Sequence, residues 1–273
     1  MRLLLGLWLM LRRARSLFGG REAPVVSHRI PAGHVVYVVG DLHGRADLLE
    51  LASRAIADDA AASPALTPLT VFLGDYVDRG AQSADIIERL ANRHFPTPIE
   101  TLLGNHEFMM LRALESDAEL ERWSQFGGLN TLFSYGVDVR PLQLGTGISQ
   151  ARLAFAAAMP AHHRAFMSRL RLNFEMGDYF FCHAGIRPQT PLAEQVVEDL
   201  IWIREAFTAS TQMHEKKIVH GHTPVKAAEL LPNRINIDTG AYITNLLSVL
   251  RLEGDSHEIM AITPRGRAPS AKG

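Results

Sequence analysis

The first half of the chain repeats one unit: an apolar run, then a polar turn that contains glycine, then a helical pattern. The apolar runs are VVYVV at residues 35–39, LTVFL at 69–73 and IETLL at 99–103. After the first run, Leu48, Leu51, Ala52, Ala55 and Ile56 recur at helical spacing. Apolar strands that alternate with helices predict an α/β fold with a mostly parallel, buried sheet.

The turn at residues 74–80, with the sequence GDYVDRG, concentrates charge directly after the second apolar run. It places Asp75, Asp78 and Arg79 between a strand and a helix that begins near Ser83. In open α/β sheets, turns at the carboxyl ends of strands are where ligands bind. Two carboxylates this close repel each other unless a cation lies between them. One such turn alone would be read as a solvated acidic turn, but similar turns occur elsewhere.

Potential metal ligands follow five apolar runs. They supply carboxylate, imidazole and amide donors but no thiolate, a set that suits Mn, Fe or Zn rather than a structural zinc site. If the strands are neighbours, these side chains meet at one edge, and two ions about 3.5–4 Å apart can activate water for phosphoester hydrolysis. The central position of Asp75 suits a bridge between two ions. The candidate ligands are Asp41, His43, Asp75, Asn105, His183 and His222.

Three further polar residues suit the remaining steps of such a reaction. Arg79 can form a bidentate pair with phosphate oxygens. His106 comes directly after Asn105 and suits a general acid that faces the leaving group. A carboxylate favours the protonated imidazole, so Asp78 is the expected partner of His106.

Composition and charge set limits on the partners and the compartment. The chain has 273 residues, 47% of them hydrophobic, and a net charge of −1. No nucleic-acid partner is therefore expected, and a phosphate site has to be built locally. The single cysteine, Cys182, excludes an intrachain disulfide and fits a reducing compartment, so we expect a cytoplasmic location.

The chain divides into a leader at 1–30, a catalytic domain at 31–264 and a disordered tail at 265–273. The leader has an apolar run at residues 3–11, too short to span a bilayer, followed by three arginines. We expect it to be disordered or to lie on a surface, which leaves open a weak contact with a membrane surface. Within the domain, residues of about 108–175 predict a helical insert, in which His162 and His163 are expected on the solvated surface at a helix start.

Five motifs together resemble the ordered signature of the phosphoprotein phosphatase family of calcineurin-like metallophosphoesterases. They are GDLHG at 40–44, GDYVDRG at 74–80, GNHE at 104–107, HAG at 183–185 and GH at 221–222. The resemblance spans roughly residues 35–250. It implies a two-layered β-sandwich flanked by helices, with a dimetal site at the carboxyl ends of the strands.

The resemblance also implies a role for each matched residue. One metal is bound by Asp41, His43 and Asp75, and the other by Asp75, Asn105, His183 and His222. His106 is the general acid held by Asp78, and Arg79 binds the phosphate together with Asn105. The expected cofactor is a pair of Mn²⁺ ions, with Fe or Zn as alternatives.

Three departures from the eukaryotic enzymes resemble the bacterial and bacteriophage branch of the family. They are Leu103 before the GNHE motif, Ala184 after His183, and the segment DTGAY at residues 238–242. That branch has a second phosphate-binding arginine in a Trp-x-Arg context, which assigns this role to Arg204; a surface charge is the alternative. Tyr242 lines the pocket or belongs to the core.

The resemblance implies a serine/threonine protein phosphatase that hydrolyses its phosphoprotein by direct attack of a metal-bound hydroxide. The main alternative is a small-molecule phosphoesterase such as a symmetrical diadenosine tetraphosphate hydrolase. The presence of Asp78 and Glu107 disfavours this alternative. Pro224 disfavours a cyclic-nucleotide phosphodiesterase. A catalytically dead binding module would be expected to have lost ligands, and none is missing. The oligomeric state is left open.

Overall fold

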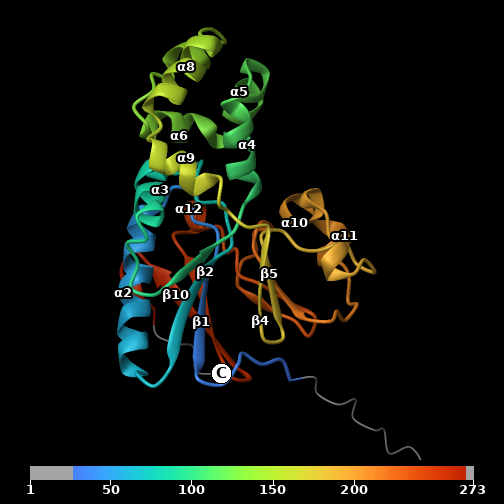
Figure 1. Ribbon diagram of the computed structural model, residues 1–273. Helices are drawn as coiled ribbons and strands as arrows, with labels where there is room; N and C mark the ends of the chain where they lie inside the picture. The colour runs from blue at the N-terminus through green and yellow to red at the C-terminus, as the bar shows by residue number, and fades with distance from the viewer. Residues whose placement is uncertain (1–26, 269–273) are drawn as a thin grey trace, which may run out of the picture.

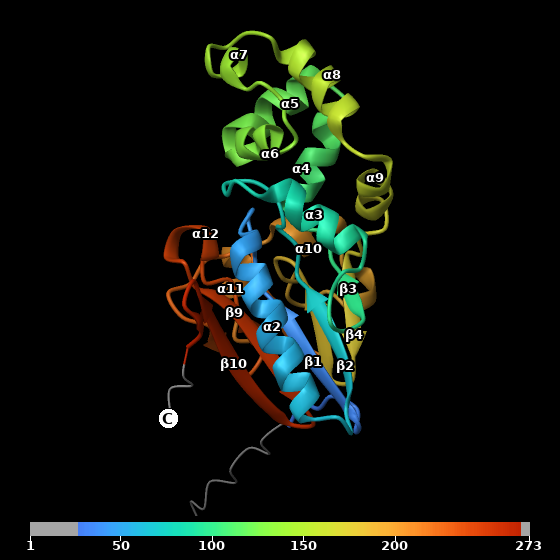
Figure 2. The same cartoon turned by 90° about the vertical axis from the view of Figure 1, so that its left-hand side faces the viewer.

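The computed structural model describes residues 27–268, which form two β-sheets packed face to face with helices on their outer sides (Figure 1). A group of helices stands above the sheets, and this arrangement is clear in both views (Figure 2). The predicted two-layered sandwich flanked by helices is confirmed. Among the described helices, none has the length and apolar character needed to cross a membrane.

The first sheet is built on the predicted β-α-β-α-β unit. Its first three strands along the chain are parallel, and α2 (Ala46–Ala62) and α3 (Ser83–Ala91) connect them. Three later strands add an antiparallel half, so the sheet is mixed. In spatial order the strands are β11 (Gly266–Arg267), β10 (Ser256–Thr263), β9 (Leu247–Glu253), β1 (His34–Val39), β2 (Thr67–Phe72) and β3 (Ile99–Thr101).

The second sheet has three parallel central strands and an antiparallel strand at each edge. On its outer face lie η2 (Leu192–Glu194), α10 (Val197–Trp202) and α11 (Glu205–Thr208). In spatial order its strands are β4 (Asn173–Met176), β5 (Tyr179–Cys182), β6 (Lys217–His220), β8 (Arg234–Asn236) and β7 (Glu229–Leu230).

The core follows the two-residue period of β1. Val36 and Val38 face the second sheet and pack in one cluster with Phe181 and Val219. The alternating residues, among them Tyr37, face the helices on the other side. Because both faces of β1 are buried, its sequence is apolar throughout, as the sequence pattern predicted.

The helical group is an insert between β3 and β4. It begins with α4 (Asn105–Ala113) directly at the GNHE turn and returns to the sheets after α9 (Ala161–Met167). Between them lie α5 (Asp117–Trp123), the π-helical segment η1 (Ser124–Gly128), α6 (Leu129–Ser134), α7 (Arg140–Gln143) and α8 (Ile148–Ala158). A short helix near the sheet edge, α12 (Ala241–Thr244), precedes β9.

The described elements differ from the predicted boundaries in three places. The insert ends before residue 175, because β4 begins at Asn173 and pairs with β5. The tail predicted to be disordered from residue 265 contains β11, which is paired with β10. In the predicted leader, the described residues belong to the domain: Ile30 is buried, and its N–H donates to the carbonyl of Gly254. The rest of the leader, residues 1–26, lies outside the described residues.

Candidate metal centre

The six predicted metal ligands meet where strands of the two sheets end. Four of them follow β1, β2 and β3 of the first sheet, and His183 and His222 follow β5 and β6 of the second. All six side chains belong to buried residues. The centre therefore lies between the two sheets, and each sheet supplies part of it.

One group of ligands surrounds the Nε2 atom of His183. Its Nδ1 lies 3.0 Å from the carbonyl oxygen of Leu73 and donates to it, which leaves a lone pair on Nε2. Nε2 lies 3.0 Å from Oδ1 of Asn105 and 3.4 Å from Oδ1 of Asp75. Nδ1 of His222 lies 3.2 Å away. The oxygens of Asn105 and Asp75 that face this lone pair are acceptors, and a cation between them offsets their repulsion.

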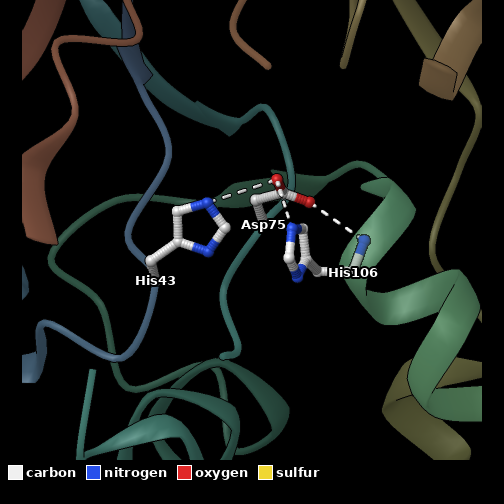
Figure 3. A group of neighbouring side chains, drawn as sticks. All are labelled: His43, Asp75 and His106. Carbon is white, nitrogen blue, oxygen red and sulfur yellow. Dashed lines mark hydrogen bonds and ion pairs between the residues drawn. The ribbon is translucent and has the colours of Figure 1, made fainter. Parts of the chain in front are cut away.

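A second group lies on the other side of Asp75. Nδ1 of His43 donates to the carbonyl of Val77 at 2.9 Å, so its Nε2 is free and lies 3.5 Å from Oδ2 of Asp75 (Figure 3). Because Oδ1 of Asp75 faces His183, this carboxylate can bridge two ions. Oδ1 of Asp41 is buried and has no hydrogen-bond partner among the described residues, as expected for an oxygen that binds a cation.

The electrostatics of these residues fit divalent cations. Burial and the charges of Asp238 and Asp75 raise the pKa of Asp41 well above its ordinary value. A bound cation offsets this repulsion. Burial lowers the pKa of His43 to about 3 and that of His222 to about 2, so both imidazoles are neutral and have the free lone pair that a metal requires. The residues present therefore fit a pair of divalent metal ions.

The backbone is strained where the site is built. Among the described residues, eight other than glycine have a positive φ, and five of these belong to the site. Such conformations cost roughly 1–3 kcal/mol each and persist only where the surroundings impose them. The five are His43, Asp75, Asp78, Arg79 and His222.

Glu107 stabilises this backbone although it is not a ligand. Its carboxylate accepts hydrogen bonds from four backbone N–H groups, those of residues 75, 76, 77 and 104, at 2.8–3.2 Å. A Cβ atom on Gly104 would lie 2.2 Å from Oδ1 of Asp75, so only glycine fits there. The GNHE turn thus holds the loop of Asp75 in place.

His106 is held as the sequence predicted. Its Nδ1 lies 2.6 Å from Oδ2 of Asp78, and its Nε2 lies 3.9 Å from Oδ2 of Asp75. Figure 3 shows the ring beside Asp75, with the backbone N–H of His106 directed at the same carboxylate. Burial lowers the pKa of His106, but the charges of Asp75 and Asp78 outweigh this effect and raise it overall. Asp78 therefore fixes the ring through Nδ1, and Nε2 faces the site.

Two residues that hold Asp78 were missed by the sequence analysis, and both come from the insert. Nε1 of Trp123 donates to Oδ2 of Asp78 at 2.7 Å, and the hydroxyl of Thr131 donates to Oδ1 at 2.7 Å. The same threonine oxygen accepts the backbone N–H of Asp78 at 2.8 Å. The insert is therefore part of the site and not only a cover.

The predicted substrate-binding residues lie around this centre. Nη2 of Arg79 is 3.3 Å from Nε2 of His106, and its guanidinium lies over the ring of Tyr242 at 4.7 Å. The Tyr242 ring also meets the His43 ring edge-on, at a centroid distance of 5.2 Å, so it lines the site. Arg204 lies between α10, which ends at Trp202, and α11, which begins at Glu205. Its Nη1 donates to the carbonyl of His222 at 3.0 Å.

A family model described as "Calcineurin-like phosphoesterase" matches residues 34–250. Serine/threonine-protein phosphatase 2 of Escherichia coli is 25% identical over 226 residues, which cover 80% of this chain and 93% of that protein. The asymmetrical bis(5'-nucleosyl)-tetraphosphatase PrpE of Bacillus velezensis is 25% identical over 209 residues, which cover 70% and 76%.

Solved structures share the fold at lower identity. A putative diadenosine tetraphosphatase has a TM-score of 0.53 at 19% identity, and the match covers 88% of this chain and 96% of that one. A cold-active protein tyrosine phosphatase also has a TM-score of 0.53, at 16% identity, with 87% and 83% covered. The fold, the buried ligand set and the family match lead to one conclusion: this chain belongs to the calcineurin-like phosphoesterase family, the metal-dependent hydrolases of phosphoesters.

Proposed function

We propose that the chain is a serine/threonine protein phosphatase that uses two Mn²⁺ ions, with Fe or Zn as alternative metals. When bound, such a pair of cations polarises the phosphoryl group and acidifies a water molecule. The single observation that carries the proposal is the anchoring of His106. Its partner Asp78 receives two side-chain hydrogen bonds from the insert, so the ring has one fixed orientation.

The nature of the leaving group explains why this anchoring favours phosphoserine and phosphothreonine. Their leaving groups are alkoxides, which are strongly basic and leave only when they receive a proton. The phosphate of a dinucleoside polyphosphate leaves with much less help. A buried imidazole that Asp78 holds in place, and whose pKa the neighbouring carboxylates raise, is therefore of most use to an enzyme that acts on alkyl phosphate esters.

In this proposal Arg79, Arg204 and Asn105 complete the binding of the phosphate. Arg79 presents its guanidinium between His106 and Tyr242, and Arg204 is tied to the loop that contains His222. A planar guanidinium can bind two phosphate oxygens at once. Oδ1 of Asn105 faces His183, which leaves its amide N–H₂ free to donate to a phosphate oxygen.

A groove next to the centre can hold more of the substrate than the phosphate. It has a volume of about 600 Å³, and its wall includes the exposed rings of Phe126 and Trp202. The Trp202 ring meets the ring of His222, and the carbonyl of Gly127, next to Phe126, accepts the N–H of Arg79. Peptide residues beside a phosphoserine fit such a groove. The complete lining is Phe108, Met109, Arg112, Glu119, Arg122, Phe126 and Trp202.

A tetraphosphatase is the second candidate, because relatives of both names are 25% identical to this chain. The test compares turnover of a phosphoserine peptide, a phosphotyrosine peptide and diadenosine tetraphosphate, each with Mn²⁺ and with a chelator. We expect the phosphoserine peptide to give the highest kcat/KM and the chelator to abolish it. A preference for diadenosine tetraphosphate would overturn the proposal, and its products would then distinguish symmetrical cleavage to ADP from asymmetrical cleavage to ATP and AMP.

We also propose a cytoplasmic location, supported by the single cysteine, which is buried in β5. The expected weak contact with a membrane surface involves the leader, outside the described residues, and stays a prediction.

A further inference from the structure

A second set of metal-type ligands lies between α3 and α9, apart from the strand ends that form the metal centre. Nε2 of His162 and Nε2 of His163, both on α9, lie 2.8 and 2.7 Å from the same oxygen of Glu88 on α3. The two imidazole rings are 4.5 Å apart. α9, the last helix of the insert, lies beside α3 in both views (Figures 1 and 2).

The position of His163 differs from the solvated surface that the sequence predicted. The side chain is only 3% exposed, and its Nδ1 lies 2.9 Å from the hydroxyl of Tyr135. A hydroxyl can donate or accept, so Tyr135 satisfies Nδ1 in either tautomer. The proton can therefore reside on Nδ1, which leaves the lone pair of Nε2 free. Histidines that bind metals are typically fixed in this way by a partner on the other nitrogen.

The protonation states also fit metal binding. The two neighbouring imidazoles lower the pKa of Glu88 to about 2, so its side chain is a carboxylate at neutral pH. Asn92 donates to its other oxygen, which leaves Oε2 for the histidines. Burial lowers the pKa of His163, which favours the neutral ring. The side chains of Glu88 and His162 are about half exposed, at 52% and 47%, so water can reach the fourth position.

We propose that Glu88, His162 and His163 form a third metal site that binds Zn²⁺ and fastens α9 of the insert to α3. Two imidazoles and one carboxylate, completed by water, make a tetrahedral set that zinc accepts, and imidazole favours zinc over Mn²⁺. Bonds of about 2.0–2.1 Å place tetrahedral ligand atoms roughly 3.3 Å apart. The present separations need to widen by about half an ångström, which the exposed side chains of Glu88 and His162 permit.

The alternative is that the three side chains form a hydrogen-bonded cluster without a metal. In that case each histidine donates a hydrogen bond to Glu88, and added zinc finds no third site. The two arrangements differ in the number of metal ions per chain, which native mass spectrometry measures directly.

The experiment uses the complete chain without an affinity tag, loaded with Mn²⁺ and then given one equivalent of Zn²⁺. We expect three divalent ions per chain in the wild type and two in Glu88→Gln and His162→Asn. His163 is left unchanged because it is buried, and His257→Asn on β10 is the control, since it removes an exposed histidine outside the cluster. A wild type with only two ions, or a Glu88→Gln variant that still holds three, would overturn the proposal.

Thermal unfolding provides a second readout. One equivalent of Zn²⁺ should raise the Tm of the Mn²⁺-loaded wild type and of His257→Asn by several degrees, because a ligand that binds only the folded state stabilises it. The Tm of His162→Asn should not respond, and this variant also decides the matter if Glu88→Gln fails to fold. Equal shifts in wild type and His162→Asn would refute a site at the α3–α9 contact.

Discussion

His106 is the single side chain on which the proposed chemistry depends most. We expect His106→Asn to lower kcat by about 10²–10⁴-fold and to change KM far less, since general acid catalysis is typically worth this much. The loss should be smaller for para-nitrophenyl phosphate than for phenyl phosphate, whose leaving group is more basic. Steady-state kinetics with both esters measure the two losses in kcat. Equal losses for both esters would assign His106 a positioning role instead.

Thr131 should act on catalysis although it is not one of the proposed metal ligands. Thr131→Val keeps the shape but removes both the donor to Asp78 and the acceptor for its backbone N–H. A hydrogen bond to a charged group is worth about 1.5–3 kcal/mol. We expect kcat to fall roughly tenfold or more, with the metal content measured by mass spectrometry unchanged. Thr131→Ser retains the hydroxyl and is the matched control, with kcat expected close to that of the wild type.

If the valine and serine variants lose the same activity, the hydroxyl is not what matters, and packing of the side chain would explain the effect. Loss of metal from Thr131→Val would likewise contradict a role limited to Asp78.

At the scale of single residues, the motifs predicted the metal ligands but not the residues that hold Asp78 in place. The six ligands come from short turns in which glycine, carboxylate and imidazole stand together. Trp123 and Thr131 are 45 and 53 residues from Asp78 along the chain and belong to helices with no motif. Their role arises only when the insert folds back over the 74–80 turn, and no local pattern encodes that contact.

The elements show a similar division between regular and irregular sequence. The buried strand β1 is a continuous apolar run and was predicted to within one residue. β4 has the sequence NFEM and β10 the sequence SHEIMAIT, in which polar residues interrupt the apolar pattern because each strand is only partly buried. Such strands form because a neighbouring strand offers hydrogen bonds, which is tertiary information.

The attachment of α2 to the first sheet leads to a prediction about acid stability. Asp59 on α2 accepts hydrogen bonds from Tyr37 of β1 at 2.6 Å and from Arg251 of β9 at 2.7 Å. Burial alone would raise the pKa of Asp59, but these partners hold it below 3.8. The carboxylate therefore adds stability above pH of about 4, and this contribution is lost as the pH falls through the lower folded pKa.

We expect Asp59→Asn to lower the free energy of unfolding by about 1–3 kcal/mol at pH 7, because a charge-assisted contact is lost. The difference from the wild type should shrink as the pH falls below about 4. Urea denaturation at several pH values measures this. Asp58→Asn changes a neighbour on the same helix and is the control. It should leave the free energy of unfolding nearly unchanged. A difference that is independent of pH would show that the charge of Asp59 is not involved.

On the scale of the whole molecule, the metal centre joins two sheets that share no strand. Asp41, His43, Asp75 and Asn105 follow strands of the first sheet, whereas His183 and His222 follow strands of the second. Across this junction, Nε2 of His183 lies 3.4 Å from Oδ1 of Asp75. Metal ions bound here link the two layers, and they also offset the repulsion that raises the pKa of Asp41.

Removal of the metals should therefore weaken the fold as well as abolish activity. A ligand present at about one hundred times its Kd contributes about 2.7 kcal/mol, and in a domain of this size each kcal/mol shifts the Tm by roughly 2–4 °C. We expect a chelator to lower the Tm by about 5–10 °C and added Mn²⁺ to restore it. Calorimetry measures both changes. Asp75→Asn removes the bridging charge, so it should bind less metal and respond much less to the chelator. A wild-type Tm that is unchanged by metal removal would mean that the packed apolar faces alone hold the two sheets together and that the ions serve only catalysis.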